Sequence, residues 1–104
     1  MRFTFTDLCP DGETYQMRFF DETLNIVWPL NADLGGVYIG DGDGTTTGST
    51  LQCILGDKVC FGAEPYPSDR GVYWGVDLDN AENCIGCCYT CANMNISYNL
   101  ICSN

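Results

Sequence analysis

Four of the eight cysteines in this chain lie within eight consecutive residues, in the sequence CIGCCYTC. Cys84 and Cys87 have the C-x-x-C spacing, and Cys88 and Cys91 repeat it immediately. Two thiolates at this spacing are a common half of a tetrahedral zinc site, whereas in an oxidising compartment the same cysteines form disulfides. The chemistry that these residues could supply is therefore metal binding, thiol redox exchange or covalent cross-linking.

The cluster differs from known redox motifs in its spacing and its context. The order C-x2-C-C-x2-C matches neither the bacterial nor the plant-type ferredoxin pattern. A reactive thiol usually lies at the N-terminus of a helix, which lowers the thiol pKa, and no segment of this sequence has helical periodicity. Disulfides and zinc therefore remain the two main interpretations.

A second cysteine pair lies in the sequence LQCILGDKVCF. Gly56-Asp57 is suited to a two-residue type II′ turn between apolar-rich strands. In that hairpin Cys53 lies directly opposite Cys60, at a separation that a disulfide can span. We predict that Cys53 and Cys60 are neighbours, joined to each other or pointing at one zinc ion together with Cys84 and Cys87.

An even number of cysteines in a chain of this length is typical of a disulfide scaffold. The disulfide candidates are Cys9, Cys53, Cys60, Cys84, Cys87, Cys88, Cys91 and Cys102. Cys9 and Cys102 are expected to tie the two ends of the chain to the rest. The alternative is a zinc site made by Cys84, Cys87, Cys88 and Cys91. A four-thiolate zinc site is dianionic, and only four cationic side chains are present to offset such charge.

The loop IGDGDGTTTGST contains two carboxylates that could bind calcium, Asp41 and Asp43. An EF-hand loop that began at Asp41 would need glycine at its sixth position and glutamate at its twelfth. The chain has Thr46 and Gln52 there instead. A calcium site of another kind at Asp41 and Asp43 is weighed against the commoner solvated Gly-Asp turn.

Charge and composition exclude several classes of function. The net charge of -10 repels nucleic-acid phosphates and anionic lipid, so we expect neither a nucleic-acid partner nor a membrane partner. The chain has no histidine, which removes the usual general base and every catalytic triad that depends on imidazole. We therefore expect a protein that is not an enzyme.

Short apolar segments with period-two alternation, separated by turn residues, predict an all-β fold. The expected strands are residues 2–7, 14–20, 24–28, 37–39, 50–55, 58–61, 72–78 and 96–102. A turn at Cys9-Pro10-Asp11-Gly12 predicts a first hairpin in which Phe3 faces Phe19 and Phe5 faces Met17. The predicted fold is a small antiparallel sandwich or barrel of about eight short strands, stapled by cysteines, in a single domain over residues 1–104.

The N-terminal sequence MRFTFTDLCPDG alternates apolar and polar residues and lacks the apolar region of a secretory signal. No later segment is apolar over the length of a membrane span. The sequence therefore predicts neither a signal peptide nor a transmembrane segment. In a reducing cytosol this expectation favours metal thiolates over disulfides.

The stretch LGGVYIGDGDGTTTG, residues 34–48, resembles the YIGDGTT hairpin of bacteriophage tail-fibre and related virion proteins. The inserted pair Gly42-Asp43 departs from the usual form. The resemblance implies a structural virion component that is made in the cytosol, released by lysis and used outside the cell. It implies protein partners and a homo-oligomeric or virion assembly. The alternatives are a small cytosolic zinc-binding protein and a secreted disulfide-rich effector.

Overall fold

The computed structural model describes residues 1–8, 14–30, 36–40, 46–66, 73–78, 80, 84 and 86–101. These residues contain nine β-strands and no helix. The strands are β1 (Arg2–Asp7), β2 (Thr14–Asp21), β3 (Ile26–Trp28), β4 (Tyr38–Ile39), β5 (Thr46–Thr50), β6 (Lys58–Tyr66), β7 (Trp74–Gly75), β8 (Cys88–Thr90) and β9 (Asn95–Leu100).

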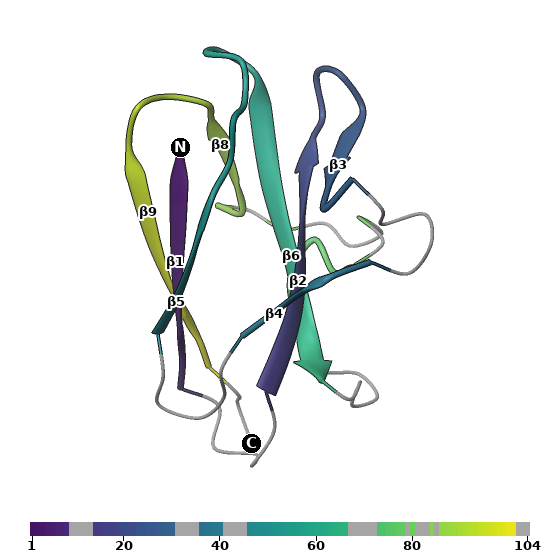
Figure 1. Ribbon diagram of the computed structural model, residues 1–104, viewed down its shortest axis with the longest axis vertical. Coiled ribbons are helices and arrows are strands. Elements are labelled where there is room, and N and C mark those ends of the chain that lie inside the picture. Colours follow the sequence, from purple (N-terminus) through teal and green to yellow (C-terminus); the bar gives the residue numbers. More distant parts are fainter. Residues whose placement is uncertain are drawn as a thin grey trace.

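The strands form two sheets, which confirms the expected all-β fold (Figure 1). The small sheet has three strands in the order β5-β1-β9. The large sheet has the order β3-β2-β6-β7, with β4 also paired to β2 and β8 also paired to β6. Among the described strands the predicted antiparallel pairing holds at every place but one, because β1 and β9 are parallel. A parallel neighbour needs a long crossover connection, and here the connection passes through the whole large sheet.

The predicted hairpin between the first two strands does not form, because β1 belongs to the small sheet and β2 to the large one. The predicted partners Phe3 and Phe19 nevertheless meet, with their ring centroids 4.9 Å apart. They face each other across the interior instead of lying side by side in one sheet. Packing between two sheets covers both sides of the rings, whereas a hairpin alone would leave one side in water.

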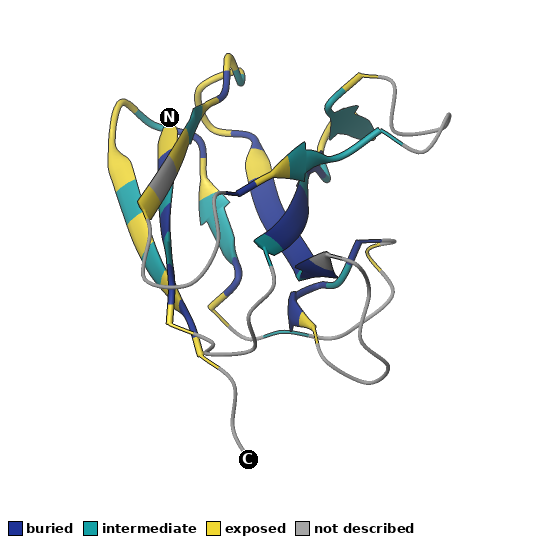
Figure 2. Cartoon of the chain, turned by 60° about the horizontal axis from the view of Figure 1, so that its bottom comes forward, coloured by how far each residue is buried: buried dark blue, intermediate teal, exposed yellow. Residues whose placement is uncertain are grey.

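Aromatic rings fill the space between the sheets. Phe3 and Phe5 point inward from β1, while Phe19 points inward from β2 and Phe61 from β6. The centroids of Phe5 and Phe61 are 5.3 Å apart, and those of Phe61 and Tyr98 are 4.6 Å apart. In Figure 2 the buried residues concentrate on the long central strands, whereas exposed residues alternate along the strands of the small sheet.

The large sheet is buried on both faces, which the sequence did not indicate. Gln16 and Phe20 lie on the face of β2 that points away from the small sheet, yet both are buried. Residues 74–78 cover this outer face and approach so closely that a side chain on Gly62 would collide with the backbone of Asp77. The absence of a side chain at Gly62 therefore allows a loop to pack directly on the sheet.

Several strand boundaries differ from the expectation, and β6, expected over residues 58–61, runs on to Tyr66. Residues 51–54 are not a strand, and β5 lies earlier in the chain. Within 73–78 only Trp74–Gly75 is a strand, because Gly75 and Asp77 have positive φ angles of 65° and 63° that end the extended conformation. β8 lies inside the cysteine cluster, where the density of cysteines obscured its short strand pattern.

Candidate functional site: the disulfide-stapled end of the large sheet

Three disulfides join the six cysteines that the structure describes. Cys53 bonds to Cys91, Cys60 to Cys88 and Cys84 to Cys87. The Cα atoms of these pairs are 6.1, 4.0 and 5.7 Å apart, respectively. Two of the bridges lie where β2 ends, β6 begins and β8 pairs with β6. We call the region formed by residues 20–25, 53–60 and 87–91 the stapled end.

The predicted Cys53–Cys60 pair is wrong, because the hairpin that would bring these cysteines together does not form. The turn begins one residue earlier than predicted, with the Asp57 amide donating to the Ile54 carbonyl at 3.0 Å. Gly56 therefore occupies the third turn position with φ 94°, as in a type II turn, whose twist does not suit a two-residue hairpin. The residues before the turn leave the sheet, and Cys53 reaches Cys91 instead.

The vicinal cysteines at the centre of the cluster form separate bridges, as the alternation of side chains along an extended backbone predicts. Cys88 lies opposite Cys60 in the β6–β8 ladder and forms a cross-strand bridge to it. Cys87 bonds back to Cys84 within the same segment. The cluster therefore fastens β8 to β6 and the 51–54 segment to residue 91.

The zinc interpretation requires Cys84, Cys87, Cys88 and Cys91 to be thiolates around one ion. In this structure their sulfurs belong to three different bridges, two of which reach Cys53 and Cys60. Among the described residues no group of three or more metal-ligating side chains comes together. A zinc site at these four cysteines therefore stays a prediction that applies to the reduced chain.

Several sequence predictions fall outside the described residues. Cys9 and Cys102 lie there, as do the calcium candidates Asp41 and Asp43. The segment that resembles the tail-fibre hairpin is described only in part, as residues 36–40 and 46–48. Its arms lie in different sheets, with β4 paired to β2 and β5 paired to β1, so these two strands do not pair with each other.

Two aspartates are buried side by side at the stapled end. Asp21, the last residue of β2, is 2% exposed, and Asp57, just before β6, is 8% exposed. Asp21 Oδ1 accepts hydrogen bonds from the Thr23 and Leu24 amides, each at 2.9 Å, and so closes the turn after β2. The Asp57 backbone carbonyl accepts a hydrogen bond from the Cys91 amide at 2.7 Å.

The Asp57 carboxyl lies in an environment that favours its neutral form. Its Oδ2 atom is buried and has no hydrogen-bond partner among the described residues. A hydrogen bond with the Asp21 carboxyl raises the pKa of Asp57 above its ordinary value of 3.8, and burial and the charge of Asp21 raise it further. When Asp57 is protonated, its carboxyl can donate a hydrogen bond to the Asp21 carboxyl.

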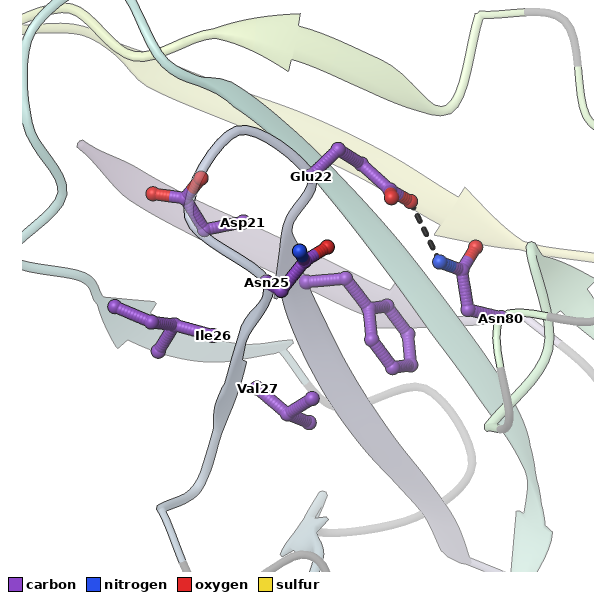
Figure 3. A pocket seen from close by; sticks show the side chains of 7 residues that line it. Asp21, Glu22, Asn25, Ile26, Val27 and Asn80 are labelled. Carbon is purple, nitrogen blue, oxygen red and sulfur yellow. Dashed lines mark hydrogen bonds between the residues drawn. The ribbon is translucent and has the colours of Figure 1, made fainter.

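Asp21 also lines a small cavity of about 210 Å³ (Figure 3). Its lining consists of Phe20, Asp21, Glu22, Asn25, Ile26, Val27 and Asn80. Glu22 and Asn80 point toward each other in the cavity lining. The side-chain Nδ2 of Asn80 donates to the Glu22 carboxylate at 2.6 Å. The volume is below the roughly 300–1,000 Å³ typical of small-molecule pockets.

Arg18 crosses the outer face of the large sheet from the middle of β2. Its Nε donates to the Gly36 carbonyl at 2.9 Å, and an Nη donates to the Leu78 carbonyl at 3.1 Å. The planar guanidinium can reach two carbonyls at once, so one side chain holds two loops against the sheet. Its positive charge is used for this structural contact.

Sequence reasoning missed the roles of Asp21, Asp57 and Arg18. The sequence FFDETLN after β2 contained a signal, because an aspartate that precedes a short polar turn commonly caps it. For Asp57 no local signal exists, since its burial beside Asp21 results from the pairing of β2 with β6. Arg18 alternates with the apolar residues of β2, and this pattern gives no sign of the two loops that cover its face of the sheet.

Comparison of the chain with protein-family models, with curated proteins and with solved structures finds no match. The part of the chain that the structure describes contains no helix that could cross a membrane. Three disulfides indicate an oxidising environment.

Proposed function

We propose that this chain is a non-enzymatic structural or adhesion module that acts through protein contacts, as a component of a bacteriophage virion. One observation carries the proposal: the side chains best able to do chemistry serve the fold. Six cysteines form bridges, Arg18 holds two loops, and Asp21 closes a turn. A covalently stapled sandwich suits a protein that must withstand conditions outside the cell.

The resemblance of residues 34–48 to the virion hairpin supports the assignment to a phage particle. The small sheet supports an assembly role, because it contributes two strands of five and six residues at its edges. Strand edges carry unpaired amides and carbonyls that can bind another chain. Capsid, tail and fibre remain three possible places for such a contact.

Mass spectrometry of density-purified phage particles tests the proposal. Tryptic peptides of this chain should be present at a fixed stoichiometry to the major capsid protein after particles are washed in high salt. A gene for the chain that lies among capsid and tail genes would agree with this result. Absence of the peptides from intact particles would overturn the virion assignment.

A secreted disulfide-rich effector is the second candidate, favoured by the same three bridges. It differs from the first in where the protein is found. An effector would be recovered from particle-free culture medium, whereas a virion component would sediment with particles. Ultracentrifugation of the medium, followed by analysis of the pellet and the supernatant, separates these two outcomes.

A further inference from the structure

Charge is distributed unevenly along this acidic chain. No residue in the stretches 44–56 and 84–104 is charged, although the whole chain has a net charge of -10. The first stretch contains β5 and the second contains β9. These are the two edge strands of the small sheet. The edges of this sheet are therefore free of the carboxylates that make the rest of the chain acidic.

The outer edge of β9 presents backbone hydrogen-bonding groups. The Arg2 amide donates to the Met94 carbonyl and the Leu8 amide to the Leu100 carbonyl, each at 2.9 Å. In a parallel ladder this pattern directs the even-numbered residues of β9 toward β1. The amides and carbonyls of Asn95, Ser97 and Asn99 consequently face away from the sheet.

The outer edge of β5 presents a matching set. The Leu51 amide donates to the Met1 carbonyl at 2.8 Å, so the odd-numbered residues of β5 face β1 in the antiparallel ladder. The amides and carbonyls of Thr46, Gly48 and Thr50 therefore face outward. Each edge of the small sheet offers three residues to a further strand.

The large sheet protects its edges and the small sheet does not. Among the described strands, those at the edges of the large sheet have only two or three residues, and Pro29 follows β3 directly. Short edge strands, prolines and lysines are the usual protection against edge-to-edge pairing. β5 and β9 are longer and contain neither proline nor lysine.

We propose that copies of this chain associate through the small sheet, with the β9 edge of one copy paired to the β5 edge of the next. β5 is antiparallel to β1 and β9 is parallel to β1, so β5 and β9 run in opposite directions. Two copies in the same orientation therefore bring them together as an antiparallel pair. Such a head-to-tail contact repeats into a ring or an open filament.

The charge pattern identifies the occupant of these edges as a second copy. A basic partner would be attracted to the acidic remainder of the surface, whereas an equally acidic copy is repelled from it. The outward face of the small sheet carries one charged side chain, Arg2, which lies over Gly48 and donates to Thr50 Oγ1 at 3.0 Å. An acidic copy can approach there without repulsion between carboxylates.

Sedimentation velocity of the oxidised full chain over a range of concentrations tests this association. The wild type should form oligomers, and more of them at about 0.5 M than at about 0.02 M NaCl, because salt screens the repulsion between copies. Ser97→Pro and Thr46→Pro each remove one outward amide without removing a backbone hydrogen bond to β1, and Thr46→Pro also removes the hydrogen bond between the Thr6 and Thr46 hydroxyls, 3.0 Å apart. Each should weaken self-association by roughly tenfold or more. Ser97→Thr and Thr46→Ser keep the amides and should associate like the wild type.

A mixing experiment distinguishes the head-to-tail contact from a symmetric one. The Ser97→Pro chain keeps an open β5 edge and the Thr46→Pro chain keeps an open β9 edge, so an equimolar mixture should form a one-to-one complex and nothing larger.

If circular dichroism shows that Ser97→Pro does not fold, Asn95→Pro blocks the same edge at the first residue of β9, where proline is tolerated. A wild type that stays monomeric at every concentration, or a Thr46→Pro chain that still dimerises alone, would overturn the proposal.

This association rests on the proposed function for its biological use, and the two can fail separately. A chain that is found in virions but stays monomeric in solution rejects the edge contact and leaves the virion assignment standing. A chain that associates through β5 and β9 but is absent from particles rejects the virion assignment and leaves the contact standing.

Discussion

Phe61 is the residue at which the two sheets meet most closely. It is completely buried on β6, and its ring contacts Phe5 and Tyr98 from the small sheet. Because packed rings contribute both buried area and favourable edge-to-face geometry, the stability of the sandwich depends strongly on this side chain.

We expect Phe61→Ala to lower the free energy of unfolding by about 3–5 kcal/mol, since the cavity it leaves lies between two rigid sheets. Chemical denaturation with intact disulfides measures the change. Tyr73→Ala is the control, because Tyr73 is 42% exposed and should change stability much less. Equal losses for the two variants would contradict the assignment of Phe61 to the interface between the sheets.

The buried Asp57 carboxyl makes the stability of the folded chain depend on pH, and a single substitution can remove this dependence. The pKa of Asp57 is raised in the folded protein, so between 3.8 and that raised value the folded chain binds more protons than the unfolded chain. The contribution of Asp57 to the free energy of unfolding is therefore fully present below pH 3.8, and it is lost as the pH rises through the pKa of the folded state. Asp57→Asn keeps the shape of the side chain, and its amide group donates a hydrogen bond at every pH, as the carboxyl does only when it is protonated.

We expect Asp57→Asn to raise the melting temperature at pH 7 and to leave it nearly unchanged at pH 3. Thermal melts from pH 3 to pH 7 measure the difference between variant and wild type. Asp77→Asn is the matched control, because Asp77 Oδ1 accepts a hydrogen bond from the Leu78 amide at 2.7 Å and asparagine can do the same. A melting temperature that differs from the wild type by the same amount at every pH would show that the pKa of Asp57 is not raised in the folded protein.

At the scale of the elements, the three bridges differ in how much chain they close. Cys53–Cys91 spans 38 residues and Cys60–Cys88 spans 28, whereas Cys84–Cys87 spans 3. If bridges act mainly by restricting the unfolded chain, the first two contribute about 4 kcal/mol each and the third about 1.6 kcal/mol. The Cys60–Cys88 and Cys53–Cys91 bridges, which hold β8 and the 51–54 segment, are therefore expected to contribute most to the free energy of unfolding.

Replacing both cysteines of one bridge by serine tests this order. We expect the Cys60→Ser/Cys88→Ser chain to unfold at a clearly lower denaturant concentration than the Cys84→Ser/Cys87→Ser chain. Intact mass confirms that the remaining cysteines are still oxidised in each variant. The reverse order of midpoints would mean that the local bridge organises the cluster before β8 can pair.

At the scale of the whole molecule, the oxidised state distinguishes the scaffold from the zinc alternative. The denatured chain should have a mass at least six hydrogens below that of the reduced chain, because three bridges are present among the described cysteines. Alkylation without reductant should leave those six cysteines unmodified. Eight alkylated cysteines together with one or more equivalents of zinc would reject the disulfide scaffold.

The sequence was sufficient for the fold class and for many of the strands, because period-two alternation is a local signal. Phe3, Phe5, Met17 and Phe19 were readable as core residues for that reason. Which strands are neighbours depends on long-range pairing, and so the β1–β2 hairpin and the Cys53–Cys60 bridge were wrong. Asp57 and Arg18 could not be identified because their burial arises only when distant segments cover them.

The parallel pair β1 and β9 sets the order in which the chain can fold during synthesis. β1 is the middle strand of the small sheet and is synthesised before its partner β9, because Arg2 pairs with Asn95 far along the chain. A growing chain can assemble β2, β3, β4 and β6 while β1 still lacks one neighbour. Pairing over so long a separation is slow. The edge of β1 that binds β9 is therefore exposed until β9 has been synthesised, and during this interval the chain is most open to a chaperone or to another copy.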